Sequence, residues 1–326
     1  MSNGVRENRD GFGTRLLLFV SDFLDEPAPA LTKVKKGIWI AGGSKGKWVV
    51  KEFASKEKLQ FQLLLSEKLF EAGFNKTYRF HQNHRWRESR FEGKLYGFIQ
   101  YIRPSQSEAF HYESRRNREQ ALTLLGEYHQ TTRKLLPELS GKAKPFDQLG
   151  KWERRLADFE HSLAKIGNYA GYSCLRDYCR WARWSLDALH EGHGGFLLKD
   201  SCIVHGDVVY HNFLLGDGGD LFLIDFDLAA EAPAVVDYLQ FCNRILPSVG
   251  WSADRLFQHS RLEPYREERG FLCALVYPTD ILREWNHFFR ADERTKKRVW
   301  PYLHDITFDE YKLRRRFAEE IIKAGS

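Results

Sequence analysis

Long apolar runs are missing from this sequence. The longest one in the N-terminal region is Leu16 to Val20, which is too short for the apolar core of a signal peptide or for a helix that spans a membrane. Internal repeats and low-complexity segments are absent as well. We therefore expect a cytoplasmic protein that is neither exported nor inserted in a membrane.

Cysteine is scarce, and its spacing carries no motif. The five cysteines are odd in number, and none of them forms the C-x-x-C pair that is typical of zinc and redox sites. We expect free, buried thiols in a reducing cytoplasm. The cysteines are Cys174, Cys179, Cys202, Cys242 and Cys273.

A strong excess of one charge is missing too. Lys and Arg number 50 and Asp and Glu 44, for a net charge of +6. The excess falls in short clusters, such as residues 115–118 and 314–316, which indicate solvated helix faces and not a nucleic-acid surface. A mildly basic field suits an anionic substrate such as a nucleotide, so we expect no nucleic-acid partner.

What the sequence contains is enough for about two domains, given its 326 residues. In the first part, residues 37–40 and 48–50 read as two strands around a glycine-rich turn. The apolar spacing from Lys56 to Ala72 predicts a helix. Further strand-like sequence covers residues 77–86 and 94–102. This part predicts a small β-rich module with one helix.

Residues 103–105 (Arg-Pro-Ser) read as a hinge, after which the sequence becomes mainly helical in its periodicity. We therefore place one domain at residues 1–102 and a second at residues 103–326. The fold class that follows is α+β, with a small β-rich lobe before a larger helical one. The predicted helices of the second domain cover residues 117–136, 152–166, 172–190, 234–246 and 305–324.

The most informative stretch begins at Cys202 and contains a predicted antiparallel hairpin. Two short apolar runs flank the turn at residues 216–220. Pairing the two apolar runs across that turn sets Phe213 opposite Ile224. Asn212 and Asp225 should then lie side by side at the open end of the hairpin.

Two oxygen-bearing side chains that meet in this way can share a hard cation such as Mg²⁺. Asp207 lies five residues before Asn212 on the loop that leads in, and it can face the same spot. In phosphoryl transfer, one Asp accepts the proton of the attacking hydroxyl while an Asn and a second Asp hold the metal on ATP. The H-x-D-x-x-x-x-N pattern is part of the kinase signature, and residues 224–227 (Ile-Asp-Phe-Asp) stand where protein kinases have D-F-G.

His205-Gly206-Asp207, Asn212 and the run 224–227 together resemble the aminoglycoside phosphotransferase and choline kinase superfamily. The nearer likeness is to its CotS-type branch of spore-coat-associated, kinase-like proteins. The resemblance is specific from about residue 202 to 240. It implies a two-lobed protein-kinase-like fold, an ATP- and Mg²⁺-dependent transfer of the γ-phosphate to a hydroxyl of a small molecule, and a possible association with the spore coat.

The resemblance also implies a lysine that holds the α- and β-phosphates, usually tethered by a glutamate of the next helix. Lys51, which ends the apolar run 48–50, is the natural choice. Glu67 lies sixteen residues further on and matches the spacing of the family. Glu57 and Glu71 remain alternatives for the partner.

No G-x-G-x-x-G run precedes Lys51. The glycines within residues 42–46 are expected to form the turn just before the lysine strand. The loop that covers the phosphates should instead lie before Val34, near residues 25–30.

Three further residues are expected to support the site. Asp237, in the first turn of a helix after Pro233, matches a structural Asp of the superfamily, and a carboxylate there can accept backbone N–H groups. We expect it to brace the catalytic loop. His205 is expected to orient that loop as a neutral ring, and Asp227 to support the metal site.

Three other readings remain open at this point. His205, Asp207 and His211 could be ligands of zinc or iron in a hydrolase, although that reading leaves the hairpin and Asp225 unexplained. The chain could also be a structural or binding protein that keeps the kinase fold and catalyses little. A protein-directed kinase is disfavoured, because no A-P-E segment follows Asp225.

Overall fold

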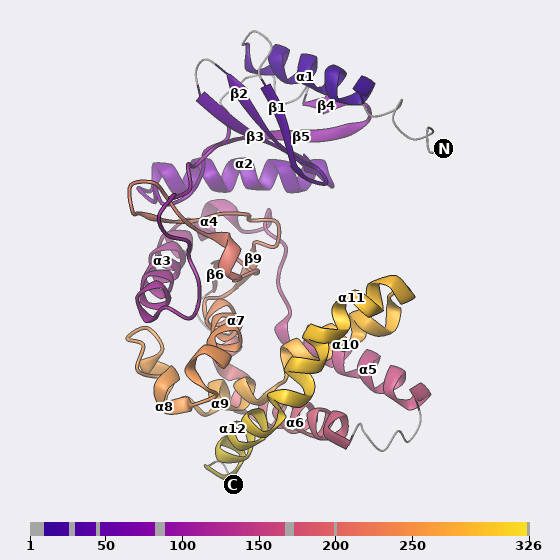
Figure 1. The fold of residues 1–326 in the computed structure, drawn as a ribbon. Helices are drawn as coiled ribbons and strands as arrows, with labels where there is room; N and C mark the ends of the chain where they lie inside the picture. Colours follow the sequence, from indigo (N-terminus) through magenta and orange to yellow (C-terminus); the bar gives the residue numbers. More distant parts are fainter. Residues whose placement is uncertain are drawn as a thin grey trace, which may run out of the picture. The chain divides into compact units, whose positions relative to one another are not determined.

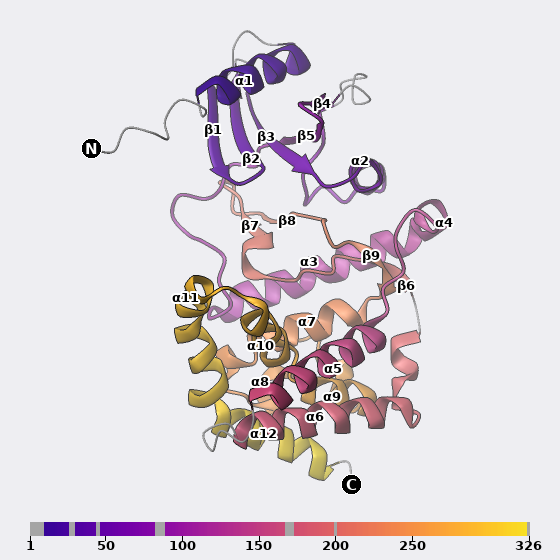
Figure 2. The same cartoon turned by 90° about the vertical axis from the view of Figure 1, so that its right-hand side faces the viewer.

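The computed structural model describes residues 10–25, 30–43, 46–81, 89–166, 173–198 and 201–324. They form two compact units, each drawn in Figures 1 and 2. The first unit, called the N-lobe below, comprises Met1–Phe110 and Asn212–Asp227. The second, the C-lobe, comprises His111–His211 and Leu228–Ser326.

The N-lobe is built on a five-stranded antiparallel sheet in the order β1-β2-β3-β5-β4. The predicted strands at residues 37–40 and 48–50 are confirmed as β2 and β3. The glycines that were expected in their turn lie at the strand ends, with Gly43 opposite Gly46, and residues 44–45 lie outside the described part of the chain. The strands are β1 (Ala30–Lys35), β2 (Ile38–Gly43), β3 (Gly46–Phe53), β4 (Arg90–Phe91) and β5 (Lys94–Gln100).

Residues 77–81 run beside β5 without forming a regular strand. Phe80 makes a single bridge to Ile99, and the Gln100 N–H donates to the Arg79 carbonyl at 2.7 Å. The remainder of the strand predicted at residues 77–86 lies outside the described residues.

Two helices cover the sheet, one on each face (Figures 1 and 2). Helix α1 (Asp10–Leu24), which the sequence analysis did not predict, packs Leu16, Val20 and Phe23 against the face that carries Trp39 and Val50. Its contribution is to bury one apolar side of the strands.

Helix α2 (Lys56–Glu71) begins at the Ser55 cap, as the apolar spacing predicted, and covers the opposite face. It packs closely there, because a Cβ at Gly97 of β5 would lie 2.6 Å from the Phe53 ring and 3.1 Å from Leu59.

A two-stranded hairpin, β7 (Phe213–Leu215) and β8 (Leu221–Leu223), also belongs to the N-lobe. The Ser105 N–H donates to the Leu215 carbonyl at 2.8 Å, and the Leu223 N–H donates to the Lys76 carbonyl at 2.9 Å. These backbone bonds join the hairpin and residues 103–110 to the first unit. The expected division at residue 102 assigned residues 103–110 and the hairpin to the second domain, whereas the structure assigns both to the first unit.

The C-lobe is mainly helical, with a small sheet of β6 (Ser201–Val204) and β9 (Ala230–Pro233). All five cysteines lie in it, and all are free and buried, as predicted. No helix of the described residues is long and apolar enough to cross a bilayer. The helices are α3 (Arg115–Lys134), α4 (Leu136–Leu139), α5 (Gln148–Ile166), α6 (Ser173–His190), α7 (Val235–Ile245), α8 (Ala253–Leu256), α9 (Arg269–Val276), α10 (Thr279–Arg290), α11 (Glu293–His304) and α12 (Tyr311–Ala324).

One helix prediction was wrong. The segment 305–324 is not a single helix, because a π-helical turn at Asp305–Asp309 separates α11 from α12. Buried side chains hold this wider turn at Thr307, where the Trp285 indole N–H donates to the hydroxyl at 3.0 Å and the Tyr178 hydroxyl donates to the carbonyl at 2.9 Å. Such turns often lie at functional sites.

Candidate active site

Lys51 lies in the middle of the N-lobe sheet, on the face that α2 covers. It is paired with Gly97 across the strands, and its side chain is only 10% exposed. The ammonium lies 2.6 Å from Asp225 Oδ1 and 2.8 Å from Asp227 Oδ1. A buried ammonium needs such partners, because a charge removed from water without them is very costly.

The hairpin of β7 and β8 leads into the segment that carries these carboxylates, and its strand pairing differs from the predicted one. Phe213 is opposite Leu223, not Ile224, because the Gly216 N–H donates to the Asp220 carbonyl at 2.8 Å and closes the turn one residue earlier. Asn212 consequently pairs with Ile224, whose N–H donates to the Asn212 carbonyl at 3.0 Å.

The backbone leaves the ladder at Asp225, which has a φ of 69°. Few residues other than glycine adopt this left-handed conformation, and Asp is among those that tolerate it best. Backbone strain of this kind gathers at functional sites, where the surrounding structure enforces it. The kink lets Asp225 and Asp227 both reach Lys51 while Phe226 between them is buried.

The α2 side chain that joins this cluster is Gln62, which is 2% exposed. Its amide donates to Asp227 Oδ1 at 2.8 Å, and its carbonyl accepts from the Tyr78 hydroxyl at 3.3 Å. Burial opposes ionisation of Asp227, but the hydrogen bonds and charge of Lys51, with the Gln62 amide, hold its pKa below the ordinary value. Burial and the Asp225 charge raise the pKa of Tyr78, which keeps its hydroxyl a donor.

The structure does not bring Glu67 to Lys51. Glu67 and the alternative Glu57 both lie on the exposed side of α2, and Glu71 pairs with Lys68 at 2.8 Å. The position beside the lysine cluster therefore carries a neutral amide where the resemblance implied a carboxylate.

The loop closest to Lys51 in the sheet register is the tight turn between β1 and β2. It consists of Lys36 and Gly37, and Gly37 has a φ of 75°. Ile38, which follows directly, is paired with Lys51. The phosphate-covering loop was expected before Val34, near residues 25–30. Residues 26–29 lie outside the described part of the chain, directly before β1 (Ala30–Lys35), so this expectation stays a prediction.

Asn212, Asp225 and Asp227 offer the oxygen donors that suit Mg²⁺. The two carboxylate side chains are 33% and 44% exposed, which leaves them open to a ligand. Asn212 is 2% exposed and lies at the base of β7. This set fits a magnesium ion by its chemistry.

In the C-lobe, the loop that carries Asp207 is braced by Asp237. Its carboxylate is fully buried and accepts hydrogen bonds from the His205 N–H at 2.7 Å, the Gly206 N–H at 2.9 Å and His129 Nε2 at 2.8 Å. Burial opposes ionisation, but the hydrogen bond and charge of His129, with the Gly206 N–H, hold the pKa of Asp237 below its ordinary value.

His205 is fully buried, and its Nδ1 accepts the Asp207 N–H at 3.3 Å. The ring therefore lies where it can orient the loop, with Nδ1 as an acceptor. His211, in contrast, is exposed. Within the described ranges, three or more His, Cys, Asp or Glu side chains lie close enough to share a metal ion only at His304, Asp305 and Asp309. His205, Asp207 and His211 do not form such a group, so the hydrolase reading loses its ligand set.

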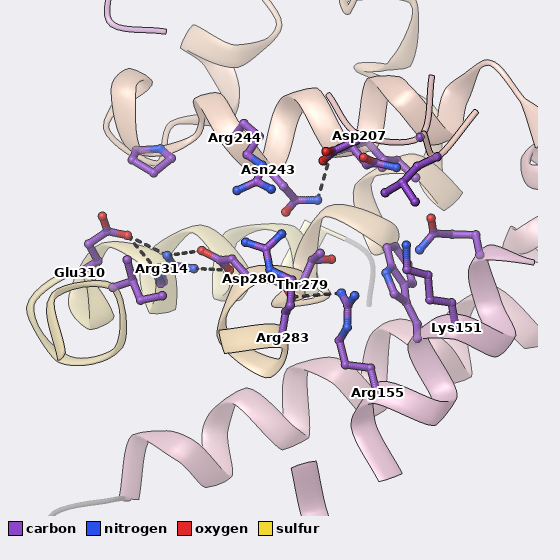
Figure 3. A pocket seen from close by; sticks show the side chains of 18 of the residues that line it. Lys151, Arg155, Asp207, Asn243, Arg244, Thr279, Asp280, Arg283, Glu310 and Arg314 are labelled. Carbon is purple, nitrogen blue, oxygen red and sulfur yellow. Dashed lines mark hydrogen bonds and ion pairs between the residues drawn. The ribbon is translucent and has the colours of Figure 1, made fainter. Parts of the chain in front are cut away.

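Asp207 lines a C-lobe cavity of about 460 Å³ (Figure 3). The walls come from α5, α7, α10 and the segment from the π-helical turn to α12. Many of the lining side chains are cationic, and the sequence analysis did not identify them as parts of one site. Among them are Lys151, Arg155 and Arg244.

Comparisons with known proteins identify the family of this chain. The sequence model described as the phosphotransferase enzyme family matches residues 39–271. No curated protein matches the chain.

Solved structures of similar fold include an aminoglycoside phosphotransferase from Alicyclobacillus acidocaldarius, with 19% identity, a TM-score of 0.68 and coverage of 93% of this chain and 95% of that one. A spectinomycin phosphotransferase bound to AMP has 13% identity, a TM-score of 0.63 and coverage of 94% and 97%. A choline kinase from Streptococcus pneumoniae has 13% identity, a TM-score of 0.50 and coverage of 96% and 100%. The predicted protein-kinase-like fold, with a sheet-based N-lobe and a larger helical C-lobe, is confirmed.

Proposed function

Because this chain belongs to the phosphotransferase enzyme family, we propose that it transfers the γ-phosphate of ATP to a hydroxyl group of a small molecule. The observation that carries the proposal is the cluster of Lys51 with Asp225 and Asp227. It combines a phosphate-binding cation and metal-binding oxygens within one lobe, as phosphoryl transfer requires.

In this proposal Lys51 binds phosphate oxygens, and Asn212 and Asp225 hold Mg²⁺ with Asp227 in support. A bound magnesium ion would offset the negative charge that develops on the phosphates. Lys51 is fixed by its strand and by burial of its side chain, so its ammonium is positioned before the nucleotide arrives. Gln62 holds Asp227 by its amide and adds no negative charge beside the phosphates.

Asp207 is the proposed base. The acceptor oxygen forms a bond to the γ-phosphorus, the bond from that phosphorus to the bridging oxygen breaks, and ADP leaves. The proton of the acceptor hydroxyl passes to the Asp207 carboxylate. Two features support this role: the loop is held by Asp237, and Asp207 borders a cavity large enough for an acceptor.

The test separates the base from the metal ligand. Asp207→Asn keeps shape and polarity but cannot take the proton, so we expect turnover to fall by roughly 10² to 10⁴ with nucleotide affinity almost unchanged. Asp225→Asn should weaken binding of Mg²⁺-ATP as well as turnover. Binding is measured by calorimetry and turnover by phosphate transfer from ATP.

Asp217→Asn is the matched control. Asp217 lies on the exposed hairpin turn, 3.6 Å from Arg103, and its substitution should leave both quantities as in the wild type. An Asp207→Asn protein that turns over at the wild-type rate would remove the basis for the assigned base.

A second candidate function is a structural or binding protein with the kinase fold and little catalysis. The short Lys36–Gly37 turn and the amide of Gln62 favour it, since both depart from the usual phosphate-binding parts. Absence of nucleotide binding at millimolar concentration would decide for this candidate. Membership of the CotS-type branch, with its possible spore-coat association, stays a prediction.

A further inference from the structure

The cavity beside Asp207 has more positive than negative side chains. Five cations and three carboxylates line it, and Figure 3 shows that they come from several helices. The cations are Lys151, Arg155, Arg244, Arg283 and Arg314, and the carboxylates are Asp207, Asp280 and Glu310.

Two of the three carboxylates are already engaged by Arg314, which is 3% exposed. Asp280 binds both ends of its guanidinium, at 2.9 Å and 2.6 Å, and Glu310 lies 2.8 Å from Nη2. Figure 3 shows this triad at one end of the cavity. Asp280 and Glu310 are therefore engaged by Arg314, and Asp280 acts on Arg155 and Arg244 through its charge alone, without an ion pair.

Arg283 has a partner of its own, because its Nη2 lies 2.7 Å from Glu284 Oε1. Glu284 is the adjacent residue on α10. This pair reduces the charge that Arg283 contributes to the cavity.

Lys151, Arg155 and Arg244 are different. Within the described ranges, none of these three side chains takes part in an ion pair with a carboxylate. Arg155 donates to the Thr279 carbonyl at 3.2 Å, and the Lys151 ammonium lies 4.6 Å from the centre of the Phe146 ring. Uncharged partners of this kind do not neutralise the positive charges, and carboxylates of the described residues act on these cations only from beyond ion-pair distance.

All three cations are partly buried, so water screens their charges less than it screens those of exposed side chains. Burial, with Arg155 and Arg283 nearby, lowers the pKa of Lys151 to about 8, although Asp207 opposes the shift. Burial also lowers the pKa of Arg155 and of Arg244. Half-buried cations that repel one another destabilise a fold, and such clusters in a cleft mark functional sites.

We propose that the acceptor is a small hydroxyl compound with an oxyanion group, which Lys151, Arg155 and Arg244 bind while its hydroxyl faces Asp207. This inference rests on the proposed function and names the substrate class of the same site. Guanidinium forks match the planar oxygens of carboxylates and phosphates. The volume of about 460 Å³ is within the range of small-molecule sites. A polycation such as an aminoglycoside, or the quaternary ammonium of choline, would meet repulsion here.

The binding experiment uses the full chain without nucleotide, so that it does not depend on turnover. Calorimetry at low salt compares inorganic phosphate, glucose 6-phosphate and gluconate with glucose, kanamycin and choline. We expect the oxyanions to bind and the neutral and cationic compounds to bind at least tenfold more weakly. Tighter binding of gluconate than of glucose 6-phosphate would assign a carboxylate acceptor, and the reverse a phosphate-bearing one.

Arg155→Gln and Arg244→Gln should each weaken oxyanion binding by roughly 10- to 100-fold, the usual effect of removing a charged hydrogen-bond donor. Arg290→Gln is the control, because Arg290 lies on exposed α10 surface at 2.5 Å from Asp158. Its variant should bind as the wild type does. Thermal unfolding of each variant verifies that it is folded.

The inference is overturned if no oxyanion of the panel binds, if kanamycin, choline or glucose binds equally well, or if both arginine variants bind oxyanions normally. The proposed function fails by a different result: oxyanions bind the cavity, yet wild-type protein with Mg²⁺-ATP transfers no phosphate to any of them. The two failures are therefore distinguishable in one set of samples.

Discussion

Replacing Asp237 tests whether the loop of Asp207 is held as the structure shows. The carboxylate is fully buried and accepts from two backbone N–H groups and the His129 ring. Asp237→Ala leaves both N–H groups without a partner, at about 1–3 kcal/mol each, and His129 loses its partner as well. We expect a loss of about 3–6 kcal/mol, a large share of the 5–15 kcal/mol typical of a folded protein.

Asp237→Asn should cost less, about 1–3 kcal/mol. Its carbonyl oxygen can still accept one of the two backbone N–H groups, of His205 or of Gly206. Its NH₂ group must then face the other, which loses its acceptor. The free energy of unfolding should therefore decrease in the order wild type, Asp237→Asn, Asp237→Ala, and this order tests the reasoning as well as either value alone.

Urea unfolding followed by tryptophan fluorescence gives the free energies. The control is Asp254→Ala, since the Asp254 side chain is 87% exposed and its pair with Arg266 at 3.0 Å lies at the surface. An exposed pair contributes about 0–1 kcal/mol. A loss below about 1 kcal/mol for Asp237→Ala would refute the account of the braced loop.

Two further predictions concern the same lobe. Gly206→Ala should destabilise the protein by at least about 1–3 kcal/mol and lower turnover, because Gly206 has a φ of 77° and a Cβ there would lie 2.2 Å from the Leu228 carbonyl oxygen. Thermal unfolding measures the stability and phosphate transfer measures the turnover. A variant of normal stability would contradict the close approach of Gly206 to Leu228. For an oxyanion acceptor, KM should rise as the pH passes about 8, because Lys151 then loses its proton. Lys151→Gln should remove this rise while the KM for ATP stays constant, and a pH profile unchanged by the substitution would show that Lys151 does not bind the acceptor.

Local periodicity predicted the elements of both lobes where one face of an element is apolar. Strands β2 and β3 and helix α2 followed from alternation and helical spacing. Helix α1 was missed although Leu16, Val20 and Phe23 already step by four and three residues. That spacing is a sufficient signal for a helix that buries one face.

Gln62 was also missed, although a signal for it exists. The residues of α2 that face the sheet include Leu59, Gln62, Ser66 and Leu69, with steps of three, four and three. A buried glutamine must have hydrogen-bond partners, and here they are the Asp227 carboxylate and the hydroxyl of buried Tyr78. The spacing that pointed to Glu67 is a property of the family, and it says nothing about which face of this helix meets Lys51.

The predicted hairpin register was wrong by one residue on one strand. Pairing Phe213 with Ile224 left Leu221 in the turn, whereas in the structure Leu221 is opposite Leu215 and Phe213 is opposite Leu223. The closing hydrogen bond from Gly216 to Asp220 depends on local backbone angles, with Gly219 at a φ of 85°. Because strand side chains alternate, such a shift changes which residues share a face, and the left-handed backbone of Asp225 restores its access to Lys51.

The reaction and the acceptor are encoded differently in this chain, and this explains why one was predictable and the other was not. Asp207, Asn212 and Asp225 lie within a short stretch, so their spacing alone predicts phosphoryl transfer. The cations proposed to bind the acceptor lie on α5 and α7, far apart in the sequence, and each resembles an ordinary surface residue until the fold brings them together. Substitutions on those helices can therefore change the charge of the cavity without touching the catalytic loop. In the proposed function the catalytic loop performs the transfer, and the charge of the cavity selects the hydroxyl compound that receives the phosphate.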